Sequence, residues 1–114
     1  MSRRRELFEE AVEVIERDYA AVDLSLRSVS RAIATSTRQL QRAFAESGGT
    51  TFRGELQRVR MERAAVLLRL GSMPVARVAR AVGYRQPAQF AKAFRRHHGE
   101  PPSAFREGSG RLAA

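Results

Sequence analysis

The 114-residue sequence predicts an all-α fold, and three observations support this prediction. Apolar residues recur at steps of three and four along most of the chain, the period of an amphipathic helix. Glycine and proline mostly stand between these stretches, where they mark the ends and starts of helices. Hydrophobic residues make up 43% of the chain, which is enough for a packed core. Because the sequence has no cysteine, a disulfide framework and thiolate metal sites are excluded.

The first three helices are expected within residues 5–50. The first covers residues 5–20, with acids on one face and five apolar residues on the other: Phe8, Ala11, Val12, Ile15 and Tyr19. Ser25 is the expected N-cap of a short second helix, and Ala34-Thr35 form a tight break after it. Ser36 followed by Gln39 has the pattern of a capping box, which starts a third helix. Gly48-Gly49 end that helix. The inner faces of these two helices contain Leu26, Val29 and Ile33, and then Leu40, Ala43 and Phe44.

A long fourth helix is expected over residues 52–70, capped by Thr51. It contains Gly54 but no proline, so it should be continuous over about 27 Å. Its apolar residues at helical spacing are Leu56, Val59, Ala64, Leu67 and Leu70. Such a helix has the length and the apolar surface to link two smaller units.

Two further helices and a short turn follow. Pro74 stands near the start of the fifth helix and Pro87 opens the sixth, positions where proline's missing N–H costs nothing. Gly83 and Gly99 end these helices. After Pro101-Pro102, residues 103–106 are expected to form a turn that packs Phe105 into the core, and residues 107–114 a flexible tail. The inner faces contain Val75, Val78, Ala79 and Val82, and then Phe90, Ala93 and Phe94.

The chain repeats itself at an interval of about 50 residues. Leu40, Ala43, Phe44 and Gly49 recur 50 positions later as Phe90, Ala93, Phe94 and Gly99. Upstream of the turn, Leu26, Val29 and Ile33 recur 49 positions later, so the second turn is one residue longer. Each repeat is a short helix, a tight turn and a second helix. This is the shape of a helix-turn-helix, whose second helix enters the major groove of DNA.

The second helix of each repeat has an outer face suited to reading bases. Arginine pairs with guanine and glutamine with adenine, and alanine methyls can touch thymine methyls. Neither face carries an acid before Glu46 or Glu100. The candidate DNA-contacting residues of the first repeat are Thr37, Arg38, Gln41 and Arg42, with Ala45 beside them. Those of the second repeat are Gln86, Pro87, Ala88, Gln89, Ala91, Lys92, Arg95 and Arg96.

Charge indicates which part of the chain meets a polyanion. The net charge is +9 and the sequence pI about 11.5. Residues 1–23 carry a net charge of −3 and residues 24–114 a net charge of +12. Because basic residues near phosphates release counterions, double-stranded DNA is the expected partner of the later residues. The acidic first helix should face away from it.

Other classes of function find little support. No nucleophile–histidine pairing, phosphate loop or paired carboxylates are present, so the chain is not expected to be an enzyme, and no cofactor is implied. His97-His98 cannot share a helix face, so no metal site is expected; packing or a phosphate contact fits them better. Phe44, Phe90 and Phe94 are expected in the core. No apolar run approaches a membrane span, and no signal peptide is evident, so a cytoplasmic, nucleoid-associated location is expected.

The stretch from Leu26 to Arg106 resembles the DNA-binding domain of the AraC/XylS family of bacterial transcription regulators. The matching segments are Ser36–Phe44, Arg60–Ala64 with Leu67-Leu68, Val78–Tyr84, Phe90–Arg95 and Gly99–Arg106. The resemblance implies seven helices, with two helix-turn-helix units joined by the long central linker helix. It places base contacts on Arg38, Gln41 and Arg42, and on Pro87, Ala88, Gln89, Ala91 and Lys92.

This sequence departs from the family's usual pattern at four positions. Ala34 replaces a usual glycine in the first turn, and Glu55 stands where an aromatic residue is common. Ala88 and Ala91 replace polar residues, so base reading by the second unit is expected to be weaker than by the first.

The expected organisation is an acidic helix plus the first helix-turn-helix unit (residues 1–50), the linker helix (51–71), the second unit (72–106) and the tail (107–114). The chain reads as a short standalone regulator or as the DNA-binding domain of a longer one. A standalone chain should bind an asymmetric site as a monomer, with RNA polymerase as a candidate second partner. Two alternatives stay open: a sequence-neutral architectural DNA-binding protein, and a protein-interaction module that uses the acidic first helix.

Overall fold

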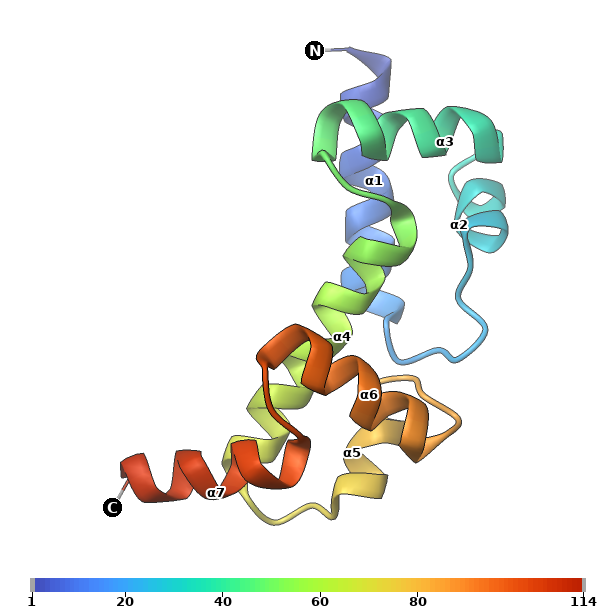
Figure 1. The fold of residues 1–114 in the computed structure, drawn as a ribbon. Helices are drawn as coiled ribbons and strands as arrows, with labels where there is room; N and C mark the ends of the chain where they lie inside the picture. The colour runs from blue at the N-terminus through green and yellow to red at the C-terminus, as the bar shows by residue number, and fades with distance from the viewer. Residues whose placement is uncertain (1, 114) are drawn as a thin grey trace. The chain divides into compact units, whose positions relative to one another are not determined.

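The computed structural model describes residues 2–113, with side chains to residue 108, and over this range it is all-α (Figure 1). Two compact units, residues 1–59 and 60–114, divide within the long fourth helix. None of the helices in residues 2–113 is long and apolar enough to cross a membrane. Seven α-helices and one π-helical turn occur in the order α1 (Arg3–Asp18), α2 (Leu26–Ala32), α3 (Thr37–Ala43), η1 (Phe44–Gly48), α4 (Phe52–Leu70), α5 (Val75–Ala81), α6 (Pro87–His98) and α7 (Pro102–Ala113).

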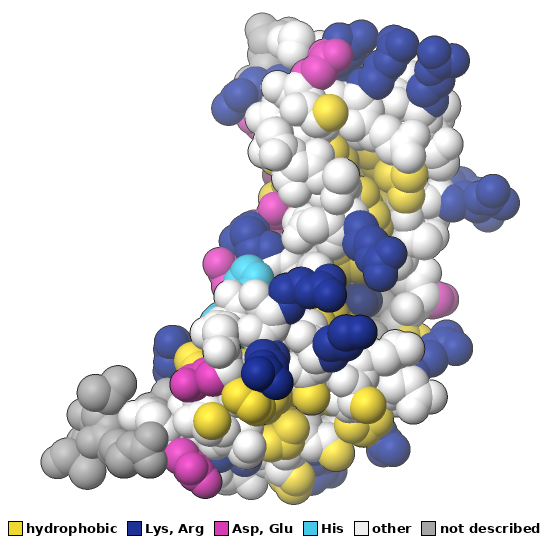
Figure 2. Space-filling view, viewed as in Figure 1, with side chains coloured by type: hydrophobic (Ala, Val, Ile, Leu, Met, Phe, Trp, Pro, Cys, Tyr) yellow, Lys and Arg dark blue, Asp and Glu magenta, His cyan; other side chains and the backbone are white. Residues whose placement is uncertain are grey.

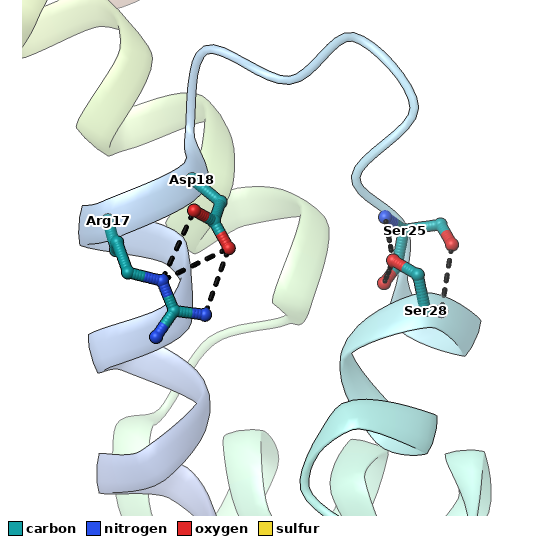
Figure 3. A network of polar contacts seen from close by, with 4 residues as sticks. All are labelled: Arg17, Asp18, Ser25 and Ser28. Carbon is teal, nitrogen blue, oxygen red and sulfur yellow. Dashed lines mark hydrogen bonds and ion pairs between the residues drawn. The ribbon is translucent and has the colours of Figure 1, made fainter.

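Hydroxyl side chains cap the helices of the first unit, as the sequence predicts. Ser25 and Ser28 form a reciprocal capping box at the start of α2, with both N···O distances at 3.0 Å (Figure 3). The Ser36 hydroxyl accepts from the Gln39 amide at 3.1 Å, which confirms the predicted cap of α3. The box there is not reciprocal, because the Gln39 side chain accepts instead from the Thr35 hydroxyl at 2.8 Å. Thr51 caps α4 through the Gly54 amide at 2.9 Å. These bonds satisfy backbone donors that a helix start leaves free.

The core of the first unit packs α1 against α2, α3, η1 and the first half of α4. Phe44 is fully buried and makes edge-to-face contacts with Phe8 and Phe52, at centroid distances of 5.2 and 5.9 Å. The prediction for α1 is partly wrong, because Leu7 and Val14 are buried, whereas Phe8 and Val12 are only half-buried. The buried stripe of α1 is therefore rotated toward Leu7. The buried residues are Leu7, Ala11, Val14, Ile15, Val29, Leu40, Ala43, Phe44, Phe52, Leu56 and Val59.

The third helix ends in a π-helical turn, which the sequence does not predict. The turn spans Phe44–Gly48 and stops at Gly49, whose φ of +63° is the left-handed conformation that glycine adopts without strain. Gly48 is required for a different reason. A Cβ built there would lie 2.4 Å from Cε1 of Phe8, so only a residue without a side chain lets this ring pack beneath the turn.

The core of the second unit is rich in aromatic rings. Phe94 contacts Phe90, His98 and Phe105 at centroid distances of 5.8, 4.4 and 5.2 Å. The predicted packing of Phe105 is confirmed, and so are the buried Phe90 and Phe94. In α4 the predicted face is wrong at its end, because Leu70 is 74% exposed and Leu68 is buried in its place. Met61, Ala64 and Ala65 complete the buried face of this half of α4.

The last helix is longer than predicted. Instead of a turn over residues 103–106 followed by a tail, α7 continues from Pro102 to Ala113. Pro102 occupies the first helical position, where its fixed φ favours the start of a helix. Arg106 holds this helix, because its guanidinium donates to the backbone oxygens of Leu68 and Met73. Gly108 and Gly110 have low helix propensity, which is why the sequence alone predicts an earlier end. Ala114 lies outside the described residues.

Candidate nucleic-acid interface

Both predicted helix-turn-helix units are present, and the first residues of their turns have the same backbone hydrogen bond and nearly the same conformation. In the first turn the Thr35 amide donates to Ser30 O at 2.9 Å; in the second, the Tyr84 amide donates to Ala79 O at 2.9 Å. The residue that follows each first helix has nearly the same conformation, with φ −105° at Ile33 and −103° at Val82. The sequence repeat is therefore a structural repeat at the end of α2 and α5 and at the start of each turn.

In the first unit, α3 turns its predicted inner residues inward and its candidate residues outward. Leu40, Ala43 and Phe44 are fully buried. The outer face is exposed at all five predicted positions, Thr37, Arg38, Gln41, Arg42 and Ala45. Among the described residues, no ion pair or side-chain hydrogen bond engages Arg38, Gln41 or Arg42. Their donors are available to an external partner.

In the second unit, α6 has the same division. Phe90, Ala93 and Phe94 are buried, and Ala91 is half-buried. The other candidate residues are exposed: Gln86, Pro87, Ala88, Gln89, Lys92, Arg95 and Arg96. Lys and Arg side chains gather over α6 in the face shown in Figure 2. The structure thus leaves the predicted residues of each unit exposed, except Ala91, which is half-buried.

A shallow hollow of about 580 Å³ lies beside the C-terminal half of α6. Two of its residues, Gly99 and Pro101, are absent from the sequence-based candidates, which were limited to helix faces. Gly99 has φ +85°, and a Cβ placed there would have nothing within 4 Å, so the hollow is open at this point. Its lining residues are Ala91, Lys92, Arg95, Arg96, Gly99 and Pro101.

The acid nearest to the α3 face in sequence is neutralised within the first unit. Glu46 of η1 forms an ion pair with Arg4 of α1. Other acids of α1 pair along their own helix: Glu6 with Arg3 at 3.5 Å and Glu9 with Arg5 at 3.3 Å. These local pairs leave the positive charge of Arg38 and Arg42 uncompensated by a neighbouring carboxylate.

The remaining polar groups near α6 support the core. His98 packs on Phe94 and Phe105, and its Nε2 lies 3.0 Å from Met61 O, so it packs as expected. Arg60 lies over the ring of Tyr84 at 5.7 Å. Its partial burial lowers the pKa of its guanidinium, and Tyr84 opposes that shift. Among the described residues no group of three potential metal ligands occurs.

Comparison with known proteins identifies the family. The family model of a helix-turn-helix domain matches residues 29–108. The C-terminal domain of AraT, a response regulator from Geobacillus stearothermophilus, superposes with a TM-score of 0.89 at 31% identity, covering 94% of this chain and 88% of that one. The chain belongs to the AraC/XylS family of helix-turn-helix domains.

Two further similar proteins bear on DNA binding and on the length of this chain relative to its relatives. The DNA-binding domain of AdpA, solved in complex with a target DNA, has a TM-score of 0.82 at 25% identity, covering 89% of this chain and 90% of that one. The transcriptional regulator GlxA of Rhizobium meliloti is 31% identical over 99 residues, which are 85% of this chain and 31% of GlxA. The chain spans about a third of the length of the curated relatives it matches.

The structure explains two of the departures from the usual AraC-type pattern. Ala34 adopts φ +56° and Gly83, its counterpart in the second unit, +98°, so the first turn holds a left-handed conformation without glycine. Glu55 is only 9% exposed, and its carboxylate lies 2.6 Å from the Arg58 guanidinium one turn later. The ion pair lets a carboxylate occupy a nearly buried position.

Proposed function

We propose that this AraC-type chain binds double-stranded DNA in a sequence-specific manner and regulates transcription in a bacterium, without a catalytic role of its own. One observation carries the proposal. Each helix-turn-helix unit presents a helix whose inner face is buried and whose outer face combines basic and amide side chains without an acid. A helix that is only solvated usually mixes both signs of charge.

The outer face of α3 has the chemistry for direct base reading. Arg38 and Arg42 can each donate two hydrogen bonds to O6 and N7 of guanine, and Gln41 can pair with N6 and N7 of adenine. The hydroxyl of Thr37, the first residue of α3, can donate to a phosphate, as residues at the starts of recognition helices commonly do. The first unit therefore offers three side chains that distinguish bases.

The outer face of α6 offers fewer base-reading groups. Gln89 is its one uncharged amide within the helix, preceded by Gln86 at the N-cap. Ala88 and Ala91 let the backbone approach the groove, and their methyl groups can touch thymine methyls. Pro87 starts the helix, and Lys92, Arg95 and Arg96 supply positive charge.

The AdpA complex and the regulator names of the relatives support the proposal at the level of the family. Because one chain carries two recognition helices and has no two-fold axis, we further propose that a single molecule binds an asymmetric site. RNA polymerase is the proposed second partner, and the bacterial nucleoid the proposed location.

The test begins with selection of binding sites from random duplex DNA. The expected result is an asymmetric consensus bound at one protein per duplex in native mass spectrometry. Arg42→Ala should then cost about 1–3 kcal/mol on the selected site and relax the preference at one or two base positions. Arg27→Ala, which removes an exposed arginine from α2 in the same unit, is the matched control and should affect selected and random duplexes alike.

Three results would overturn the proposal. Recovery of no consensus, with tight binding to random competitor, would favour the sequence-neutral architectural alternative. A palindromic consensus bound at two proteins per duplex would refute the single-molecule arrangement. Absence of DNA binding, together with a partner lost on neutralising Glu9, Glu13 and Glu16, would favour the protein-interaction alternative.

A further inference from the structure

Positive charge is divided very unequally between the two units. Residues 1–59 contain ten bases and nine acids, a net charge of +1, whereas residues 60–114 contain eleven bases and three acids, a net charge of +8. The helix with the better base-reading side chains, α3, belongs to the nearly neutral unit. The unit with the better base-reading side chains therefore carries little of the net positive charge.

In the second unit, three of the eleven bases line the hollow beside α6. Lys92 is three residues before Arg95 and four before Arg96, so all three cations lie on one face of the helix. Like charges at this spacing destabilise a helix in the absence of an anion. No carboxylate among the described residues pairs with them. A bound anion would remove this repulsion.

The shape and lining of the hollow fit a phosphate group better than a base edge. Its other lining residues, Ala91, Gly99 and Pro101, have no polar side-chain atom, so the three cations are its only charged groups. Arginine donates paired hydrogen bonds to phosphate oxygens, and lysine adds a point charge. A hollow that is open to solvent admits a polymer backbone that enters and leaves it.

We propose that this hollow is a binding site for the DNA backbone, in which Lys92, Arg95 and Arg96 hold phosphates while α3 reads the sequence. The inference rests on the proposed function and adds a division of labour to it. The second unit supplies affinity that does not depend on sequence, and the first unit supplies most of the preference between sequences.

An alternative role for the three cations is to oppose the helix dipole, since Arg95 and Arg96 lie in the last turn of α6. That role predicts a loss of thermal stability when they are neutralised, with no specific effect on DNA. Thermal unfolding of each variant therefore accompanies every binding measurement.

The experiment compares two double variants of the full chain, Arg95→Gln/Arg96→Gln and Arg77→Gln/Arg80→Gln. The second pair is the matched control, because it removes two exposed arginines from α5 of the same unit. Affinity for the selected duplex and for a random duplex is measured between 50 and 400 mM salt. Each lost phosphate contact should reduce the slope of log affinity against log salt by about 0.9.

The expected result is specific to the hollow. Arg95→Gln/Arg96→Gln should reduce the slope by about 1.8, equivalent to roughly 60-fold weaker binding at 0.1 M salt, by the same factor on both duplexes. Its selected consensus and its melting temperature should be unchanged. The control variant, Arg77→Gln/Arg80→Gln, should show a clearly smaller reduction in both the slope and the affinity. In ethylation interference on the selected duplex, one or two phosphates whose ethylation weakens binding of the unaltered chain should no longer do so with Arg95→Gln/Arg96→Gln. The control variant should show no such change.

Other outcomes overturn the inference while leaving the proposed function intact. Equal losses in both double variants would mean that affinity follows the net charge of the unit and not this site. A changed consensus would make Arg95 or Arg96 a base contact, and an unchanged affinity would assign the hollow to another partner, such as an acidic protein surface. If inorganic phosphate shifts the α6 amide resonances at millimolar concentration while Arg95→Gln/Arg96→Gln binds DNA as tightly as the unaltered chain, the site binds free phosphate and not a DNA backbone.

Discussion

Replacement of Ala34 by glycine should stabilise the first unit, which is unusual for a substitution to glycine. Ala34 adopts φ +56°, and the equivalent residue of the second turn is a glycine. The left-handed conformation costs a residue with a Cβ about 1–2 kcal/mol, whereas glycine loses about 0.5–1 kcal/mol of additional chain entropy on folding. The difference predicts a gain of about 0.5–1 kcal/mol, equivalent to a rise of about 2–6 °C in melting temperature for a unit of this size.

Thermal unfolding monitored by circular dichroism measures this change in stability. Two control variants are expected to change stability in the opposite direction. Ala32→Gly makes the same chemical change two residues earlier, in the last turn of α2, and should lower stability by about 0.5–1 kcal/mol. Gly83→Ala places a Cβ on the left-handed residue of the second turn and should also be destabilising. If Ala34→Gly lowers stability as Ala32→Gly does, residue 34 does not carry the strain that its φ implies, and the explanation of the first turn is wrong.

Three further substitutions test the packing around the two units. Ser30→Ala should stabilise the first unit by about 1 kcal/mol in urea unfolding, because the buried Ser30 hydroxyl has no hydrogen-bond partner among the described residues and Ala79 occupies the same place in the second unit. A loss of stability would show that the hydroxyl is paired in solution. Gly48→Ala should lower the free energy of unfolding by about 1–3 kcal/mol, because the added Cβ collides with the Phe8 ring. This loss of stability should be smaller in a Phe8→Leu background, and equal losses in both backgrounds would contradict the contact. Phe94→Ala should cost roughly 3–5 kcal/mol, since its ring is fully buried among Phe90, His98 and Phe105, and a change below 1 kcal/mol in the same assay would place that ring outside the core.

Features that depend on neighbouring residues in the sequence were predictable. The caps at Ser25, Ser36 and Thr51 follow from a hydroxyl placed before an apolar helix, because the donors that it satisfies lie only two or three residues away. The repeat of inner residues at an interval of about 50 was sufficient to predict both helix-turn-helix units and the outward position of the α3 and α6 candidates.

Features that depend on a choice between equivalent faces were not predictable. The second half of α4 has apolar residues on several sides, so a stripe through Leu67 and Leu70 fits the helical period as well as the stripe through Met61, Ala64 and Leu68 that is buried. The π-helical turn has no local signal, and the contact of Gly48 with the Phe8 ring joins residues 40 positions apart in the sequence. The hollow beside α6 requires Gly99 and Pro101, which lie beyond the end of the helix.

The packing of α1 bears on how a mutational scan of this protein should be interpreted. The family match begins at residue 29, yet Leu7, Ala11 and Ile15 belong to the same core as Leu40 and Phe44 of the α3–η1 segment. Substitutions in the buried stripe of α1 should therefore impair the proposed DNA recognition indirectly, by releasing α3, the helix that we propose reads the bases. In a genetic screen they would form a cluster resembling a contact surface for another protein. Exposed positions on the same helix, such as Glu13, distinguish the two cases, because a true contact surface would be sensitive there and a support for α3 would not.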